Sequence, residues 1–231
     1  MNRKISCAVA IAAAAGAVSF ALPGTASAAP AFNCAKVATP SNSNGWGNTV
    51  PDERGQAGKI TAGVASDNDG SLEFATSAST KRQASYHSAS QLPLADLNGS
   101  ALTFQKSNGN ANWQIRITGA NTGTSSGFAT LVWGAPIGAG KADATSSNQW
   151  WATRKLGNIP AAQNASLSAL IAAANSDGKK AVVDLYGISS QPGGTADAKV
   201  NVDEVTFKGC TTNFKVSGGG NGSIEFPSFG S

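Results

Sequence analysis

Few residues of this chain are suited to catalysis. Its one histidine, His87, lies in a predicted strand at 82–88. A Ser-His-Asp triad also needs a serine exposed on a strained turn, and we predict no such turn. A glycoside hydrolase needs two carboxylates facing each other across a cleft, but the spacing selects no pair among the acidic candidates, Glu53, Glu73, Asp184 and Glu204. We therefore expect a protein without enzymatic activity.

One loop is rich in the oxygen ligands that calcium prefers. It runs Asp67-Asn68-Asp69-Gly70-Ser71, but it is not an EF-hand, because Leu72 and Ala78 stand where that motif needs Gly and Glu. A β-turn before a strand is the simpler interpretation. Asp203, at a predicted β-bulge, could join this loop as a ligand of a structural calcium ion. We expect no other metal or cofactor.

The five tryptophans are the strongest indication of a binding function. Trp113 and Trp133 are in phase with neighbouring apolar residues, which predicts core positions. Trp150 and Trp151 are adjacent, so in a strand one indole packs inside and the other is displayed. A displayed flat ring suits stacking on a sugar or on another protein. Trp46, in a Gly/Asn-rich loop, is a further aromatic that could contact a ligand.

Polar residues on the predicted strands supply the other half of such a surface. Gln114, Arg116 and Tyr186 alternate with apolar neighbours and are expected to point outward. Amide, guanidinium and phenol groups make directional hydrogen bonds to hydroxyls, although they are also ordinary residues of a sheet surface. The predicted ligand-binding set is therefore Trp150, Trp151, Gln114, Arg116 and Tyr186.

Alternation of apolar and polar residues predicts short strands through most of the chain. The candidates are 59–64, 72–76, 82–88, 102–104, 113–117, 131–133, 149–154, 181–186 and 199–207. In the last of these, apolar residues move from even to odd positions at Asp203-Glu204, which predicts a β-bulge. Helical spacing occurs once, at about 165–175. The expected fold is all-β, an antiparallel β-sandwich (jelly roll) of about eight or nine strands with one short helix.

The first 28 residues read as an export signal. Arg3 and Lys4 precede an apolar stretch at 9–22, and Ala26-Ser27-Ala28 has the small residues of a cleavage site. A membrane anchor is disfavoured because Pro23-Gly24 ends the apolar stretch before it could span a bilayer. We expect a secreted, extracellular protein with no membrane span in its mature chain. Residues 29–215 would form the sandwich domain and 216–231 a Gly-rich flexible tail.

Charge and cysteine content narrow the classes further. Removing residues 1–28 takes two of the 17 basic residues and none of the 13 acidic ones, so the mature net charge is 15 − 13 = +2. A nucleic-acid-binding protein is expected to carry a stripe of basic residues, and the sequence has none, so we expect no nucleic-acid partner. Cys7 is removed when the export signal is cleaved. We expect the two remaining cysteines, Cys34 and Cys210, to form a disulfide in an oxidising compartment. The alternative, two free thiols or a metal pair, is disfavoured because no His or third Cys accompanies them.

From Leu72 to about Phe214 the sequence resembles the galactose-binding-like jelly-roll carbohydrate-binding modules of secreted bacterial proteins. The residues that carry this resemblance are the strand at 71–74, the Trp133 strand, Trp150-Trp151 followed by the helix at 166–174, and the closing strand at 202–207. The resemblance implies ligand contacts from aromatic and polar residues on a sheet or its loops, and a structural calcium ion. No clear calcium-ligand pattern occurs near the mature N-terminus.

Together these features predict a secreted, non-catalytic module that binds an extracellular glycan or cell-surface component, with a polysaccharide or cell-surface glycan as the expected partner. The alternative is a protein of the envelope or secretome whose sheet face or Gly-rich tail binds a protein partner. Because many functions share one fold, the resemblance bears on the fold more than on the function.

Overall fold

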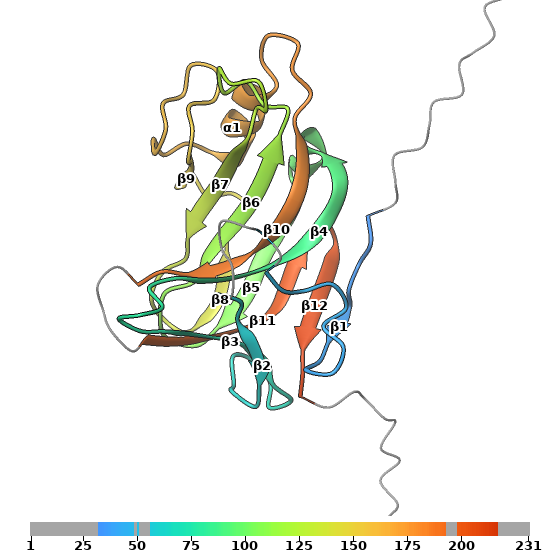
Figure 1. Ribbon diagram of the computed structural model, residues 1–231, viewed down its shortest axis with the longest axis vertical. Coiled ribbons are helices and arrows are strands. Elements are labelled where there is room, and N and C mark those ends of the chain that lie inside the picture. Colours follow the sequence, from blue (N-terminus) through green and yellow to red (C-terminus); the bar gives the residue numbers. More distant parts are fainter. Residues whose placement is uncertain (1–31, 49, 51–55, 193–197, 217–231) are drawn as a thin grey trace, which may run out of the picture.

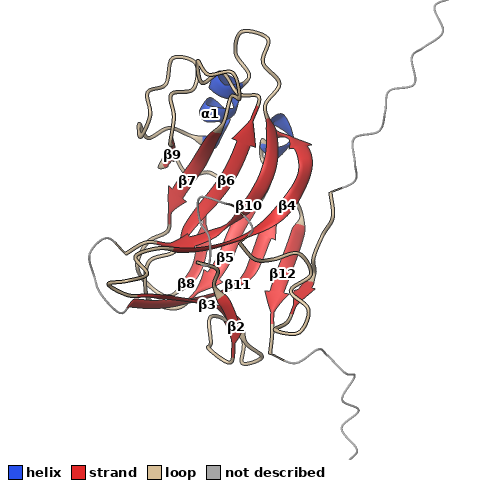
Figure 2. Cartoon of the chain, viewed as in Figure 1, coloured by secondary structure: helices blue, strands red, loops and turns tan. Residues whose placement is uncertain are grey.

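The computed structural model describes residues 32–48, 50, 56–192 and 198–216. Two β-sheets pack face to face, and one short α-helix lies at one end of the sandwich (Figure 1). Strands dominate the described chain, as Figure 2 shows. The predicted all-β sandwich with one helix is therefore confirmed. The predicted export signal and residues 217–231 of the predicted tail lie outside the described residues.

The larger sheet has seven strands and is built around its longest one, β11 (Ala198–Phe207). Val202 pairs with β3 on one side and β5 on the other, and Thr206 pairs with β12 and β5 in the same way. β2 extends the sheet beyond β3, β8 beyond β5, and β1 beyond β12. The other six strands are β1 (Val37–Ala38), β2 (Lys59–Thr61), β3 (Ser71–Thr76), β5 (Leu102–Lys106), β8 (Gly140–Asp143) and β12 (Cys210–Phe214).

The smaller sheet has five strands in the order β4-β10-β6-β7-β9, and every neighbouring pair is antiparallel. These strands are β4 (Gln83–Pro93), β6 (Asn112–Thr118), β7 (Ala129–Gly134), β9 (Trp150–Ala152) and β10 (Val182–Ser190). Twelve strands are thus described, more than the eight or nine predicted. The strands that the sequence did not reveal are β1, β8 and β12, which are short.

The core lies between the two sheets and is rich in aromatic rings. Trp113 is fully buried and Trp133 is 5% exposed, so their predicted core positions are confirmed. The ring centre of Phe104, from the opposite sheet, lies 5.8 Å from that of Trp113. Contacts of this kind join the sheets by apolar burial, the dominant favourable contribution to folding.

The helix α1 (Leu167–Ala174) covers one end of the sandwich, and the 3₁₀ turn η2 (Leu94–Leu97) lies beside it. Ser166 is its N-cap, and the Ser166 hydroxyl accepts a hydrogen bond from the Ala169 backbone N–H at 3.2 Å. The apolar stripe of the helix, Leu167, Leu170, Ile171 and Ala174, is buried. The helix predicted at 165–175 is therefore confirmed.

Two strands are irregular. The β11–β5 pairing changes register between Asp203 and Thr206, and Glu204 has a positive φ of 48°, which confirms the predicted bulge. A second irregularity, in β10, lies between Val183 and Leu185 and was not predicted. Each one changes which face of the sheet the following residues occupy.

The two ends of the domain are joined covalently. Cys34 and Cys210 form the predicted disulfide, with their Cα atoms 5.7 Å apart. Next to the bond, β1 runs parallel to β12. Among the described helices, none has the length and apolar character needed to cross a membrane.

Candidate ligand-binding face

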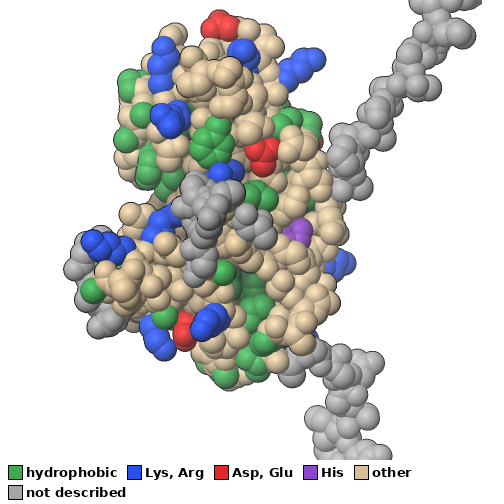
Figure 3. Space-filling view, in the orientation of Figure 1, with side chains coloured by type: hydrophobic (Ala, Val, Ile, Leu, Met, Phe, Trp, Pro, Cys, Tyr) green, Lys and Arg blue, Asp and Glu red, His purple; other side chains and the backbone are tan. Residues whose placement is uncertain are grey.

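The outer face of the five-stranded sheet carries most of the residues predicted to bind a ligand. Side chains alternate along a strand, so every second residue of β6, β7 and β9 points away from the core. The register places the outward residues in a row across the sheet, in the order Tyr86, Gly187, Gln114, Val132 and Trp151. Figure 3 looks onto this side of the molecule, where hydrophobic and basic side chains lie next to one another.

Trp150 and Trp151 occupy opposite faces of β9, as predicted from their adjacency. Trp150 is 0% exposed, and its Nε1 donates a hydrogen bond to the Ala144 carbonyl oxygen at 3.0 Å. Trp151 is only half-buried and lies opposite Val132 on the outer face. The prediction that Trp150 binds the ligand is therefore wrong. Trp151 is the indole that remains for stacking.

Gln114 and Arg116 point outward from β6, as predicted. The guanidinium carbon of Arg116 lies 4.8 Å from the ring centre of Phe128 and 5.8 Å from that of Tyr86. These cation–π contacts hold the guanidinium over the sheet. Gln114 is 7% exposed, and its amide makes no hydrogen bond within the described part of the chain. The buried amide therefore keeps unused hydrogen-bonding capacity.

Tyr186 does not belong to this face, and its predicted role is wrong. It is 1% exposed and stacks on Phe207 across the core, with ring centres 3.9 Å apart and planes inclined by 5°. Burial raises the pKa of its phenol. Val183 is buried in the core, and regular alternation would turn Tyr186, three residues later, to the outer face. The irregularity between Val183 and Leu185 reverses this alternation and brings Tyr186 inward.

A small apolar cluster covers the β4 side of the same face. It consists of Val50, Ala84, Tyr86 and Leu185, and the Arg82 guanidinium donates to the Tyr86 hydroxyl at 3.2 Å. The sequence did not identify Tyr86 as an outward residue, because its alternation with Ser85 and His87 favours a core position. Among the outward residues of β6, β7 and β9, Arg116 and Trp151 are half-buried, whereas Gln114, Thr130 and Val132 are buried.

His87 lies inside the sandwich, whereas a general base has to come within hydrogen-bonding distance of its substrate. It is 2% exposed, and its ring nitrogens lie 2.8 and 3.0 Å from the backbone carbonyl oxygens of Ser88 and Asn44. The loop at 123–127 has the Gly-x-Ser-x-Gly spacing of a hydrolase, which the sequence-based prediction overlooked. That loop joins the antiparallel strands β6 and β7, whereas a nucleophile elbow joins a strand to a helix.

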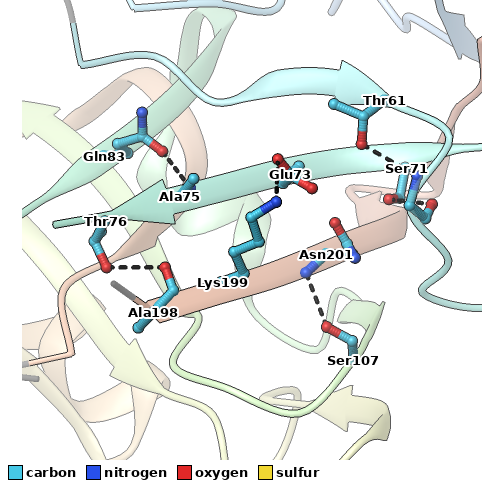
Figure 4. Close-up of polar contacts among 11 residues, drawn as sticks. Thr61, Ser71, Glu73, Ala75, Thr76, Gln83, Ser107, Ala198, Lys199 and Asn201 are labelled. Carbon is cyan, nitrogen blue, oxygen red and sulfur yellow. Dashed lines mark hydrogen bonds and ion pairs between the residues drawn. The ribbon is translucent and has the colours of Figure 1, made fainter. Parts of the chain in front are cut away.

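The other acidic candidates for catalysis are distributed over both sheets. Figure 4 shows Glu73 on the seven-stranded sheet, where its carboxylate lies 3.5 Å from the ammonium of Lys199. Glu204 lies at the bulge of β11 in the same sheet, whereas Asp184 belongs to β10 in the other. Glu53 lies outside the described residues. This distribution gives no support to a catalytic carboxylate pair.

Trp46, the loop aromatic considered as a ligand contact, is 5% exposed and packs in the core. Its ring centre lies 5.0 Å from that of Phe214 and 5.5 Å from that of Tyr186. It therefore contributes nothing to the outer face.

Three carboxylates meet where the 67–71 loop approaches the β11 bulge. One oxygen from each of Asp67, Asp69 and Asp203 lies within 4.8 Å of the others. Asp203 is fully buried and accepts hydrogen bonds from the Phe214 backbone N–H at 2.8 Å and from the Ser66 hydroxyl at 3.0 Å. Burial raises the pKa of Asp203 to about 6. The group fits calcium in ligand type, and the calcium ion itself stays a prediction.

Comparisons with protein-family models, with curated proteins and with solved structures gave no match to this chain. The resemblance to carbohydrate-binding modules therefore depends on the sequence features alone. A function has to be argued from the geometry of the residues themselves.

Proposed function

We propose that this chain is a secreted, non-catalytic module that binds an extracellular glycan or cell-surface component on the outer face of its five-stranded sheet. The observation that carries the proposal is the half-buried indole of Trp151 at the β9 edge of that face. The disulfide and the sequence features of an export signal support an extracellular site of action. The resemblance to carbohydrate-binding modules is consistent with the same function.

The row of outward residues suits a sugar polymer. The apolar C–H face of a sugar ring can stack on the indole of Trp151. The Gln114 amide lies two strands away in the same row, and Arg116 lies two residues further along the same strand. Both can bond ring hydroxyls. Because these side chains stand on paired strands, little conformational freedom is lost when a ligand binds.

The experiment compares the mature wild type with Trp151→Ala, using affinity electrophoresis against cellulose derivatives, xylan, arabinan and solubilised peptidoglycan. Retention by one polymer is expected, together with quenching of tryptophan fluorescence. Trp151→Ala should weaken binding about tenfold or more, as for a central aromatic contact. Trp151→Phe should retain most of the affinity, since it keeps a flat ring.

Lys199→Met, on the opposite sheet, is the control and should bind like the wild type. Thermal denaturation should show all variants folded, because Trp151 is not part of the core. Retention that is equal in Trp151→Ala and the wild type would overturn the assignment of the site. No retention by any polymer would favour the alternative, in which this face binds a protein partner.

A further inference from the structure

A pocket lies between the segment that follows β1 and the strand β2. It has a volume of about 340 Å³, at the lower end of the range for ligand-binding pockets. Its apolar wall consists of Pro40, Trp46, Ile60 and Leu72. Ile60 packs against the core but is only half-buried, whereas Leu72, its partner on β3, is buried. The pocket is therefore a gap in the apolar packing at the border of the core.

The chemistry of the pocket favours an uncharged, apolar occupant. Lys59 also borders the pocket, but alternation along β2 directs its side chain to the face opposite Ile60, where it lies across from Glu73. Ser85 is 1% exposed, and its hydroxyl accepts a hydrogen bond from the Gly58 backbone N–H at 3.0 Å. No acidic side chain is among the described residues that line the pocket. An apolar side chain that fills the pocket would leave water, which is favourable.

The described part of the chain ends beside this pocket. The Lys215 backbone N–H donates to the Ala38 carbonyl oxygen at 3.0 Å, and Ala38 directly precedes the pocket wall. The Val216 backbone N–H donates to the Asp69 carbonyl oxygen at 3.0 Å, three residues before Leu72. In Figure 1 the end of β12 and the strand β2 lie together at the lower end of the molecule. The chain beyond residue 216 therefore starts only a few residues away from the pocket.

The sequence beyond residue 216 combines a polar linker with an apolar end. Residues 217–223 are only Gly, Ser and Asn, and seven residues can span up to about 25 Å. Ile224, Glu225 and Phe226 follow, in the alternation that is typical of a strand with one apolar face. This segment has the reach and the apolar side chains that the pocket requires.

We propose that the C-terminal segment of this chain folds back and inserts the side chains of Ile224 and Phe226 into the pocket. Residues 217–223 are the linker, and the two inserted side chains pack against Ile60 and Leu72. The occupant of the pocket is thus part of the same molecule. No residue of the outer face of the five-stranded sheet takes part, so the proposal is independent of glycan binding.

The edge of the sheet and its charge suit this occupant. Among the described strands β2 pairs only with β3, so its other edge offers backbone hydrogen-bonding groups to an incoming segment. With Ile224 and Phe226 directed into the pocket, alternation turns Glu225 to the opposite face. That face of β2 carries the exposed Lys59, whose charge is opposite to that of Glu225.

The test is NMR spectroscopy of the full mature chain with labelled isoleucine methyl groups and phenylalanine rings. Nuclear Overhauser effects should connect the Ile60 methyl groups with the Phe226 ring, and Ile60→Val identifies the Ile60 signal by its loss. Phe226→Ser should remove these effects and shift the Ile60 signal. Phe229→Ser is the matched control, because it removes the same ring from the same segment but lies outside the alternating pair. It should leave both observations unchanged.

Binding of Nile red, a neutral apolar dye, gives a second readout. A pocket that the C-terminal segment occupies about nine-tenths of the time binds a competitor about tenfold more weakly. Phe226→Ser should therefore bind the dye about tenfold more tightly than the wild type, whereas Phe229→Ser should bind it like the wild type. Both variants should fold, because neither residue belongs to the core cluster.

Three results would overturn the proposal. The first is a folded wild type without contacts between Ile60 and Phe226. The second is equal affinity of Phe226→Ser and Phe229→Ser for the dye. The third is contacts that arise only between labelled and unlabelled molecules in a mixed sample, because the occupant would then be a second copy of the chain. Trp151→Ala should leave the Ile60 contacts unchanged, which separates this result from the glycan test.

Discussion

Removing the disulfide between Cys34 and Cys210 should lower the free energy of unfolding by about 5 kcal/mol. The bond joins residues 176 positions apart. For a loop of that length the chain-entropy relation gives about 17 cal/mol/K, or about 5 kcal/mol at 25 °C. The closed loop contains every strand of both sheets except β12, which begins at Cys210 and continues beyond the loop, so unfolding releases nearly its full length. Alanine is the appropriate replacement because Cys210 is 5% exposed and a serine hydroxyl there would be buried.

Urea denaturation of the double variant Cys34→Ala/Cys210→Ala measures this loss. With a slope of about 2 kcal/mol/M, the midpoint should fall by about 2.5 M. The Tm should fall by about 10–20 °C, as expected for a domain of this size. Wild type treated with a reductant should give the same shift, which controls for the substitutions themselves.

A fall in Tm of less than about 4 °C would refute the reasoning, because it corresponds to about 1 kcal/mol. The bond would then restrain only the segment around β1, which has two residues and few contacts to lose. Unfolding of that segment alone would leave the stability of the two sheets unchanged.

Three further predictions follow from buried polar groups. Lys106 is 1% exposed and its ammonium donates to four backbone carbonyl oxygens at 2.6–3.1 Å, so Lys106→Met should cost about 3 kcal/mol or more in urea denaturation. Lys141→Met should be nearly neutral. When a chelator keeps calcium from the site, the native state holds the Asp203 proton more tightly than the unfolded state does, because burial raises the pKa of Asp203 from 3.8 to about 6. Stability should therefore fall by about 3 kcal/mol as the pH rises from about 4 to about 6, and Asp203→Asn should flatten this dependence. Calcium should raise the Tm at pH 7 in the wild type and fail to do so in Asp69→Asn; an equal response in both would contradict the predicted calcium ion.

The two β-bulges show where sequence patterns succeed and where they do not. At Asp203-Glu204, valines occupy even positions before the bulge and apolar residues occupy odd positions after it, so the change is visible in the sequence. Around Asp184 the neighbours Val183, Leu185 and Tyr186 are all apolar or aromatic, and either alternation is acceptable. The pattern therefore could not place Tyr186, which the structure puts in the core.

Polar residues in the interior also limit what alternation can predict, because the pattern assigns them to the surface. Ser85 and His87 face the space between the sheets, whereas their apolar neighbours Ala84 and Tyr86 lie on the outer face. Lys106 occupies an inward position of β5, and its ammonium donates hydrogen bonds to carbonyl groups of two separate loops. Such partners come from distant parts of the chain, so no local sequence signal identifies them.

The sequence by itself determined the β-sandwich, its single helix, the disulfide and the opposite orientation of Trp150 and Trp151, because these follow from residue spacing and from the pairing of two cysteines. Only the tertiary structure decided which indole is buried, which outward residues stay accessible and which groups line the pocket beside Trp46. Alternation fixes how neighbouring side chains are oriented relative to each other. Which of the two faces becomes the interior depends on the opposing sheet, on the strand register and on bulges that shift it.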